Sequence, residues 1–178
     1  MTEWRPGGRR ADRASMLRVD QAGEYGATRI YAGQLAVLRD NCPEAKLIAR
    51  MAAQEERHLA RFNALMAERR VRPTALQPFW RVAGFTLGAV TALMSEKAAL
   101  ACTDAVETEI DRHYGEQLAE LGDDDPELAA DIAEFRADEL EHRDTARAAG
   151  ATSALGYPLL TAAIRAGCRM AIGLSKRI

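Results

Sequence analysis

The chain contains an internal repeat, and this repeat constrains its fold more than any other feature. The segment RVDQAGEYGATRIYAGQLAVL (18–38) aligns with ACTDAVETEIDRHYGEQLAEL (101–121) at an offset of 83 residues. The segment IARMAAQEERH (48–58) aligns with IAEFRADELEH (132–142) at an offset of 84 residues. Apolar residues recur in these segments at steps of three and four, the spacing of one helix face. The repeat therefore predicts two helical hairpins of common ancestry.

Breaker residues set the expected helix boundaries. Helices are expected over about 14–38, 44–70, 96–121 and 126–149, with an apolar segment at 79–95 and a last helix ending in SKRI. Pro43 and Pro126 suit first helical turns, Gly122 can end a helix and Asp125 can cap the next one. Nothing alternates with period two. The predicted fold class is therefore all-α: a four-helix bundle of two duplicated hairpins, with additional apolar helices in the crossover and at the C-terminus.

Composition narrows the setting. A chain of 178 residues is long enough for one compact domain and too short to expect two. We expect a single domain over 1–178, with 1–12 as a flexible tail. The net charge of −2 gives no argument for nucleic-acid binding. The three cysteines form no CxxC, which argues against a disulfide framework or structural zinc and fits a reducing compartment.

Each hairpin carries one glutamate on its first helix and a Glu-x-x-His motif on its second. Residues three apart lie on one helix face, so the Glu and His of each motif can converge on one ion. Four carboxylates and two imidazoles are the ligand set of a ferritin-like di-iron or di-manganese site. Without cations, four inward-facing carboxylates would repel one another and lose hydration. The predicted metal ligands are Glu24, Glu55, His58, Glu107, Glu139 and His142.

A simpler interpretation is that these glutamates are solvated and the repeat only records an old duplication. However, Glu24 is followed by Ala27, Tyr31 and Leu35 at steps of three and four, and Glu107 lies on a matching apolar stripe. An unpaired carboxylate is rare on such a stripe. The pattern therefore favours the metal site. Asp111 and Asp138 are the candidates to orient the histidines through their outer ring nitrogens.

The segments RVDQAGEYGATRIYAGQ, ACTDAVETEIDRHYGEQ and AGCRMAIGLSKRI resemble the demethoxyubiquinone hydroxylases, ferritin-like di-iron enzymes of ubiquinone biosynthesis. The resemblance runs from about Met16 to the C-terminus. It implies that two iron ions (Fe²⁺) are bound, with Glu55 and Glu139 as bridging carboxylates. Glu24 and His58 would complete one iron site, and Glu107 and His142 would complete the other.

The resemblance also implies a reaction and its partners. A demethoxyubiquinol ring would be hydroxylated with O2, using a reductant such as NADH or the quinol pool, and a lipid-binding protein would be a partner. His113 and Tyr114 resemble a His-Tyr pair linked with electron delivery. The alternative, in which Tyr114 packs and His113 is exposed, stays open.

Two apolar segments raise the question of membrane contact. VAGFTLGAVTALMS (82–95) is uncharged but shorter than the ~20 residues that span a bilayer. The last helix places four basic residues among apolar ones: Arg165, Arg169, Lys176 and Arg177. We expect contact with an anionic membrane surface through residues about 79–95 and the C-terminal helix. Core packing or burial in a dimer are the alternatives. With no signal peptide at its start, this bacterial-type chain is expected at the cytoplasmic face of the cell membrane as a peripheral protein.

Rival functions share parts of this pattern. A rubrerythrin- or ferritin-like protein that oxidises or stores iron would use the same ligands, although a rubrerythrin would usually also carry a CxxC iron site. A hydroxylase of modified tRNA would predict a basic stripe, whereas basic and acidic residues are interleaved here. A structural bundle or lipid carrier would bind no metal.

Overall fold

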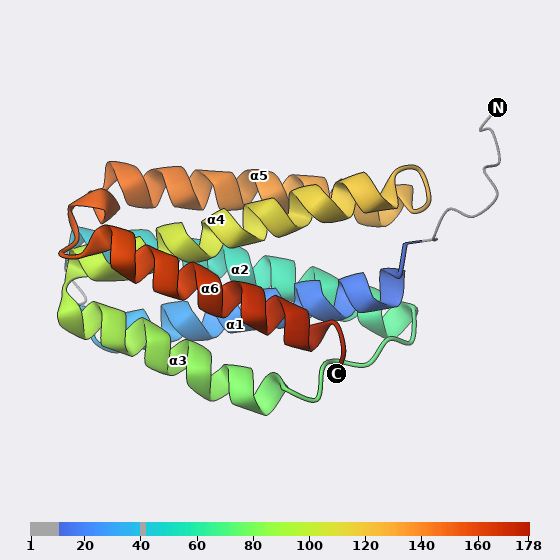
Figure 1. The fold of residues 1–178 in the computed structure, drawn as a ribbon, viewed down its shortest axis with the longest axis horizontal. Helices are drawn as coiled ribbons and strands as arrows, with labels where there is room; N and C mark the ends of the chain where they lie inside the picture. Colours follow the sequence, from blue (N-terminus) through green and yellow to red (C-terminus); the bar gives the residue numbers. More distant parts are fainter. Residues whose placement is uncertain (1–10, 40–41) are drawn as a thin grey trace.

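The computed structural model describes residues 11–39 and 42–178, and within these ranges all regular secondary structure is helical (Figure 1). The elements are α1 (Arg13–Leu35), α2 (Pro43–Glu68), α3 (Gln77–Met94), α4 (Glu96–Leu121), α5 (Pro126–Ala148), a 3₁₀ turn η1 (Ala151–Ser153) and α6 (Tyr157–Ser175). The predicted all-α class is confirmed.

The predicted end of the first helix was placed too far along the chain. This helix ends at Leu35 rather than 38, because the sequence there carries no proline or glycine stop. The last helix, predicted to end in SKRI (175–178), ends at Ser175. Of the flexible tail predicted for 1–12, residues 1–10 lie outside the described residues. Asp12 accepts a hydrogen bond from the Ser15 backbone N–H and caps α1.

The remaining helix ends follow the predicted capping chemistry. Pro43 and Pro126 occupy the first turns of α2 and α5, and the Asp125 carboxylate accepts from the Leu128 N–H. Gly122 ends α4 with a φ of 49°, a backbone conformation that glycine adopts without strain.

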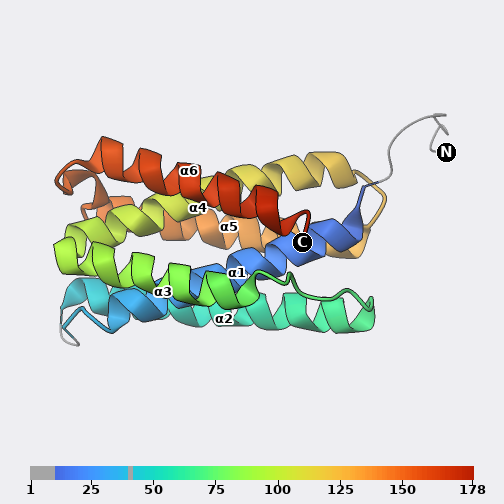
Figure 2. The same ribbon diagram turned by 60° about the horizontal axis from the view of Figure 1, so that its bottom comes forward.

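The hairpins α1/α2 and α4/α5 form a four-helix bundle, and each is followed by a third helix on its outer side. Helices α3 and α6 both contact α1 and α4, so they form a layer on one side of the bundle (Figures 1 and 2). As a result α1 and α4 are enclosed on most sides, and even their polar residues are buried. Helices α2 and α5 bury one face only.

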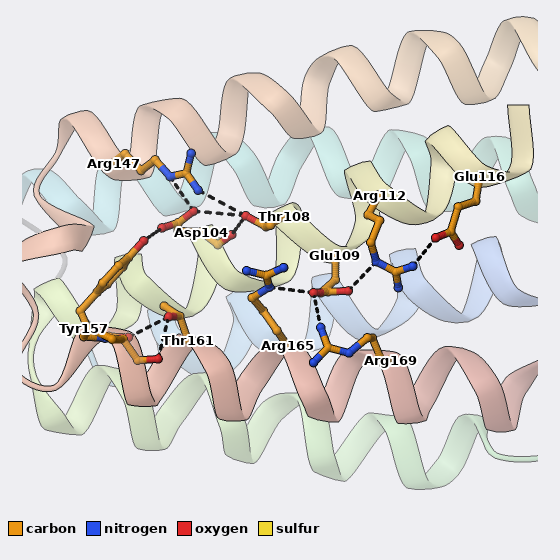
Figure 3. Close-up of polar contacts among 11 residues, drawn as sticks. Asp104, Thr108, Glu109, Arg112, Glu116, Arg147, Tyr157, Thr161, Arg165 and Arg169 are labelled. Atoms are coloured by element: carbon orange, nitrogen blue, oxygen red, sulfur yellow. Dashed lines mark hydrogen bonds and ion pairs between the residues drawn. The ribbon is translucent and has the colours of Figure 1, made fainter. Parts of the chain in front are cut away.

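Helix α6 is fixed to α4 by buried acidic residues (Figure 3). The Glu109 carboxylate is fully buried and accepts hydrogen bonds from Arg165 and Arg169 of α6, both at 2.7 Å. Burial raises the pKa of Glu109, but Arg165, Arg112 and Arg169 together outweigh it and the net pKa is lowered. One turn earlier, Asp104 accepts from Arg147 and Tyr157. Arg165 and Arg169, which were expected at a lipid surface, pair with Glu109 while their side chains remain 41% and 48% exposed.

Helices α1 and α3 pack so closely that glycine is required at the crossing. A Cβ atom added at Gly33 would lie 2.1 Å from the Phe85 carbonyl oxygen, and one added at Gly88 would lie 1.9 Å from that of Ile30. Both contacts are with backbone atoms of the facing helix, which cannot rotate away. The two helices would have to separate to admit a side chain.

We therefore expect Gly33→Ala to lower the free energy of unfolding by about 1–3 kcal/mol through overpacking. Gly23→Ala, on the same helix, is the matched control, because a Cβ there meets nothing within 4 Å. That control should instead stabilise α1 by roughly 0.5–1 kcal/mol. Urea unfolding of both variants measures the difference, and equal stabilities would contradict the close approach of α1 and α3.

Candidate metal centre

All six predicted ligands converge inside the four-helix bundle. Ligand atoms within 4.8 Å of one another form two groups, Glu24, Glu55, His58 and Glu139 in one, and Glu55, Glu107, Glu139 and His142 in the other. Each residue is at most 2% exposed. Glu55 and Glu139 belong to both groups, which is the arrangement that bridging ligands require.

The inward-facing atoms of these residues fit cations. Eight buried atoms have no hydrogen-bond partner: Glu24 Oε2, Glu55 Oε1 and Oε2, His58 Nδ1, Glu107 Oε2, Glu139 Oε1 and Oε2, and His142 Nδ1. Buried polar atoms are nearly always paired, so a cluster of unpaired acceptors needs a positively charged occupant. Carboxylate oxygens and imidazole nitrogens suit first-row transition metals.

Each histidine presents Nδ1 to the centre and Nε2 to an outer partner. His58 Nδ1 lies 3.4 Å from a Glu139 oxygen, and His142 Nδ1 lies 3.1 Å from Glu55 Oε1. The Nε2 atom of His58 lies 3.0 Å from Asp138 Oδ2, and that of His142 lies 3.0 Å from Gln54 Oε1. These acceptors fix Nδ1 as the free ligand atom.

Sequence reasoning named one of these outer partners correctly. Asp138 contacts His58, but Asp111 does not contact a histidine and instead accepts from Arg136 at 2.7 Å. The other partner, Gln54, was missed. The signal was in the repeat, because Gln54 aligns with Asp138 at the same offset of 84 residues that aligns the two Glu-x-x-His motifs.

Two tyrosines from matched repeat positions hold the remaining glutamates. The Tyr31 hydroxyl donates to Glu107 Oε1 at 2.6 Å, and the Tyr114 hydroxyl donates to Glu24. Each tyrosine therefore orients a carboxylate of the opposite hairpin. The sequence had aligned the tyrosines without assigning them this role, because a tyrosine on an apolar stripe does not reveal which helix it faces.

His113 lies beside this network rather than at the surface. It is 4% exposed, and its Nε2 lies 3.5 Å from Asp20 Oδ1. The alternative in which His113 is exposed is therefore wrong, because His113 faces Asp20 of α1 inside the bundle. Tyr114 is packed, as that alternative required, and it also contacts Glu24.

The buried carboxylates of the centre repel one another, and this shifts their pKa values. Burial and the neighbouring charge of Glu139 raise the pKa values of Glu55 and Glu107 well above normal. Burial also raises the pKa of Glu24, but the neighbouring His58, Glu55 and Tyr114 side chains together outweigh it, and the net pKa is lowered. Burial lowers the pKa of His58, whereas the nearby Glu139 and Glu24 carboxylates raise it to about 10.

These features define the class as a helical-bundle protein with a buried carboxylate–histidine site suited to metal ions. Comparison with known proteins then identifies the family. The chain belongs to the family described as ubiquinone biosynthesis protein COQ7, whose profile matches residues 11–175.

Curated relatives cover most of the chain. It is 56% identical over 162 residues to "3-demethoxyubiquinol 3-hydroxylase" of Rhodospirillum rubrum, covering 91% of this chain and 76% of that protein. It is 50% identical over 167 residues to "NADPH-dependent 3-demethoxyubiquinone 3-hydroxylase, mitochondrial" of Homo sapiens, covering 92% and 76%. It is 42% identical over 179 residues to "5-demethoxyubiquinone hydroxylase, mitochondrial" of Saccharomyces cerevisiae, covering 92% and 77%.

Proposed function

We propose that this chain hydroxylates the ring of a demethoxyubiquinol in ubiquinone biosynthesis. The observation that carries the proposal is 56% identity to a curated 3-demethoxyubiquinol 3-hydroxylase over 91% of the chain. The buried cluster of four glutamates and two histidines supports it, because hydroxylation of an aromatic ring with O2 needs a redox cofactor that amino-acid side chains do not supply.

We further propose that the cofactor is a pair of iron ions. Glu24 and His58 would hold one ion, Glu107 and His142 the other, and Glu55 and Glu139 would bridge them. When bound, the irons supply the electrons that activate O2. Mixed carboxylate and imidazole ligands favour iron over calcium or magnesium, which prefer oxygen alone.

The protein's own contribution is to position ligands and exclude water. The Tyr31 and Tyr114 hydroxyls keep one oxygen of Glu107 and one of Glu24 turned away from the centre. The Phe135 ring stacks on His58 with centroids 4.2 Å apart, and Phe62 packs against Phe135. This apolar packing shields one side of the centre from solvent, so a reactive species formed there would not be quenched by water.

Electron delivery through His113 and Tyr114 stays a proposal. It is supported by a continuous line of contacts, because Asp20 lies beside His113 and the adjacent Tyr114 donates to Glu24. The electrons would come from a reductant such as NADH or the quinol pool. The name of the human relative specifies NADPH dependence, which supports a nicotinamide cofactor as the ultimate donor.

The layer formed by α3 and α6 is the proposed membrane-contacting surface. No described helix is long and apolar enough to cross a bilayer. However, Leu93 at the end of α3 is 71% exposed and Leu159 at the start of α6 is 78% exposed. These helix ends lie at the same end of the bundle (Figures 1 and 2). Apolar side chains gathered this way suit the acyl boundary of a membrane, where a polyprenyl-tailed substrate resides.

A lipid-binding protein is a further proposed partner.

We expect the chain to float with vesicles containing anionic lipid, and Leu93→Ser with Leu159→Ser to weaken this binding. Burial of one leucine is worth roughly 1.5–3 kcal/mol, so each change should lower the partition coefficient about tenfold or more. Ala137→Ser on the exposed face of α5 is the control and should float like the unmodified protein. Failure of the unmodified chain to float, or equal flotation of all variants, would rule out this surface.

The proposed reaction is tested by incubating the iron-loaded protein with a short-tailed demethoxyquinol, a reductant and ¹⁸O2. We expect a product heavier by one ¹⁸O atom, measured by mass spectrometry. Iron oxidation without any change in the quinol would instead favour the ferritin-like alternative.

A further inference from the structure

The two halves of the metal centre match in their ligands but differ in the residues around the two histidines: Phe135 stacks on His58, whereas the repeat aligns Met51 with Phe135. Their ligands correspond through the repeat, and so do the tyrosines that hold Glu24 and Glu107. The outer partners of the histidines also come from matched positions, but one is a carboxylate and the other an amide: Asp138 behind His58, and Gln54 behind His142. Both acceptors lie 3.0 Å from the respective Nε2, so these two contacts have the same length and differ in the charge of the acceptor.

A carboxylate behind a ligating imidazole makes that imidazole a stronger donor. The Nε2–H group shares its proton with the anionic oxygen, and electron density increases at Nδ1, the atom that faces the centre. A neutral amide oxygen fixes the same tautomer without this effect. Arg57 reaches Asp138 only at 4.0 Å and is 65% exposed, so solvent screens most of its opposing charge.

We propose that the two metal positions are inequivalent. The position formed by Glu24 and His58 binds a divalent cation more tightly than the position formed by Glu107 and His142, and Asp138 is the positioning residue responsible. It follows that the two positions fill in order, and that the ion beside His58 is the one whose higher oxidation state is favoured. This inference rests on the proposed metal centre but not on the quinol reaction.

The test uses Co²⁺ as a probe, because it is stable in air and its visible spectrum reports coordination by nitrogen and oxygen. His142→Ala leaves only the Glu24/His58 position complete, and His58→Ala leaves only the Glu107/His142 position complete. Titration of the metal-free variants should give an affinity at least about tenfold higher in the His142→Ala protein, since outer-shell partners change metal affinity by roughly 10–100-fold.

Two isosteric substitutions then assign the cause. Asp138→Asn should weaken Co²⁺ binding about tenfold in the His142→Ala background and leave the His58→Ala background unchanged. Gln54→Glu should strengthen binding by a similar factor in the His58→Ala background only. A structural disturbance would not produce this gain, and it would not be confined to one background. Circular dichroism checks that each variant keeps its helices.

The outcomes separate the inference from the site on which it rests. Absence of Co²⁺ binding to the unmodified chain would overturn the metal centre itself. Two bound ions with equal affinities, or an Asp138→Asn effect of the same size in both backgrounds, would overturn the inequivalence while the centre stands.

Discussion

Replacing Glu139 with alanine is expected to abolish ring hydroxylation while leaving most of the helical structure intact. Glu139 is fully buried and belongs to both groups of converging ligand atoms, so its loss affects both metal positions. Even outer-shell changes cost roughly 10–100-fold in metal affinity or activity, and loss of a bridging ligand should exceed about 100-fold. His142→Ala should act similarly by removing one ligand. Iron content and product formation measure the loss.

The chain provides a close control for this experiment. Glu141 lies two residues further along α5 but is exposed, so Glu141→Ala removes the same charge from the same helix without touching the centre. We expect Glu141→Ala to retain iron and activity. Full activity in Glu139→Ala or His142→Ala would contradict the assignment of these residues as ligands.

Chelation of the metal is expected to make the stability of the protein strongly dependent on pH. The folded-state pKa values of Glu55, Glu107 and Glu139 are raised, chiefly by burial. A carboxyl group with a raised folded pKa stabilises the fold fully below its ordinary pKa, about 4.5, and this contribution is lost as pH rises through the folded value. The raised pKa of His58, about 10, acts in the same direction, and the lowered pKa of His142 opposes it. The melting temperature of the metal-free protein should therefore fall between pH 5 and pH 8.

The loaded protein should not show this fall, because the cations keep the carboxylates ionised. Thermal melts with and without chelator across this range measure both curves. If chelation left the melting temperature unchanged at pH 8, the cluster would not be a metal site.

Two neighbouring glutamates of α4 allow a second test of the metal centre, because only one of them faces it. Glu107→Gln keeps an acceptor for Tyr31 but removes a buried charge, and it should stabilise the metal-free protein by about 1–3 kcal/mol while impairing metal binding. Glu109→Gln, two residues away and equally buried, should destabilise it, because Glu109 holds Arg165 and Arg169. We expect the two Glu→Gln substitutions to change the free energy of unfolding of the metal-free protein in opposite directions. This result would show that the Glu107 carboxylate serves metal binding, whereas the Glu109 carboxylate holds α6 against α4.

The six converging residues were predictable because the repeat supplies long-range information. One Glu-x-x-His motif indicates a helix face, whereas two motifs at matched positions indicate which faces meet. The predicted bounds of α4 were confirmed for a different reason, since Ser95 caps its start and Gly122 ends it. Where a local stop signal is lacking, as after Leu35, the predicted end was wrong.

The spacing of apolar residues could not predict which side chains of neighbouring helices contact each other. The hydrogen bond from Tyr31 to Glu107 and the ion pairs of Glu109 depend on the rotation of α1, α4 and α6 about their own axes. The burial of His113 depends on the same rotation of α4, which turns this side chain toward Asp20 of α1. A pattern of apolar residues defines one face of a helix, but an enclosed helix has several occupied faces.

Each of the two tyrosines donates a hydrogen bond to a glutamate of the other hairpin, so the duplicated halves depend on each other. Tyr31 of the first hairpin serves Glu107 of the second, and Tyr114 of the second serves Glu24 of the first. A primitive half-length polypeptide would have lacked the hydroxyl donors for its own carboxylates unless a twin was bound to it. The crossed hydrogen bonds are therefore ones that a symmetric pair of identical hairpins could also make, whereas different residues at positions 54 and 138 require two distinct hairpins.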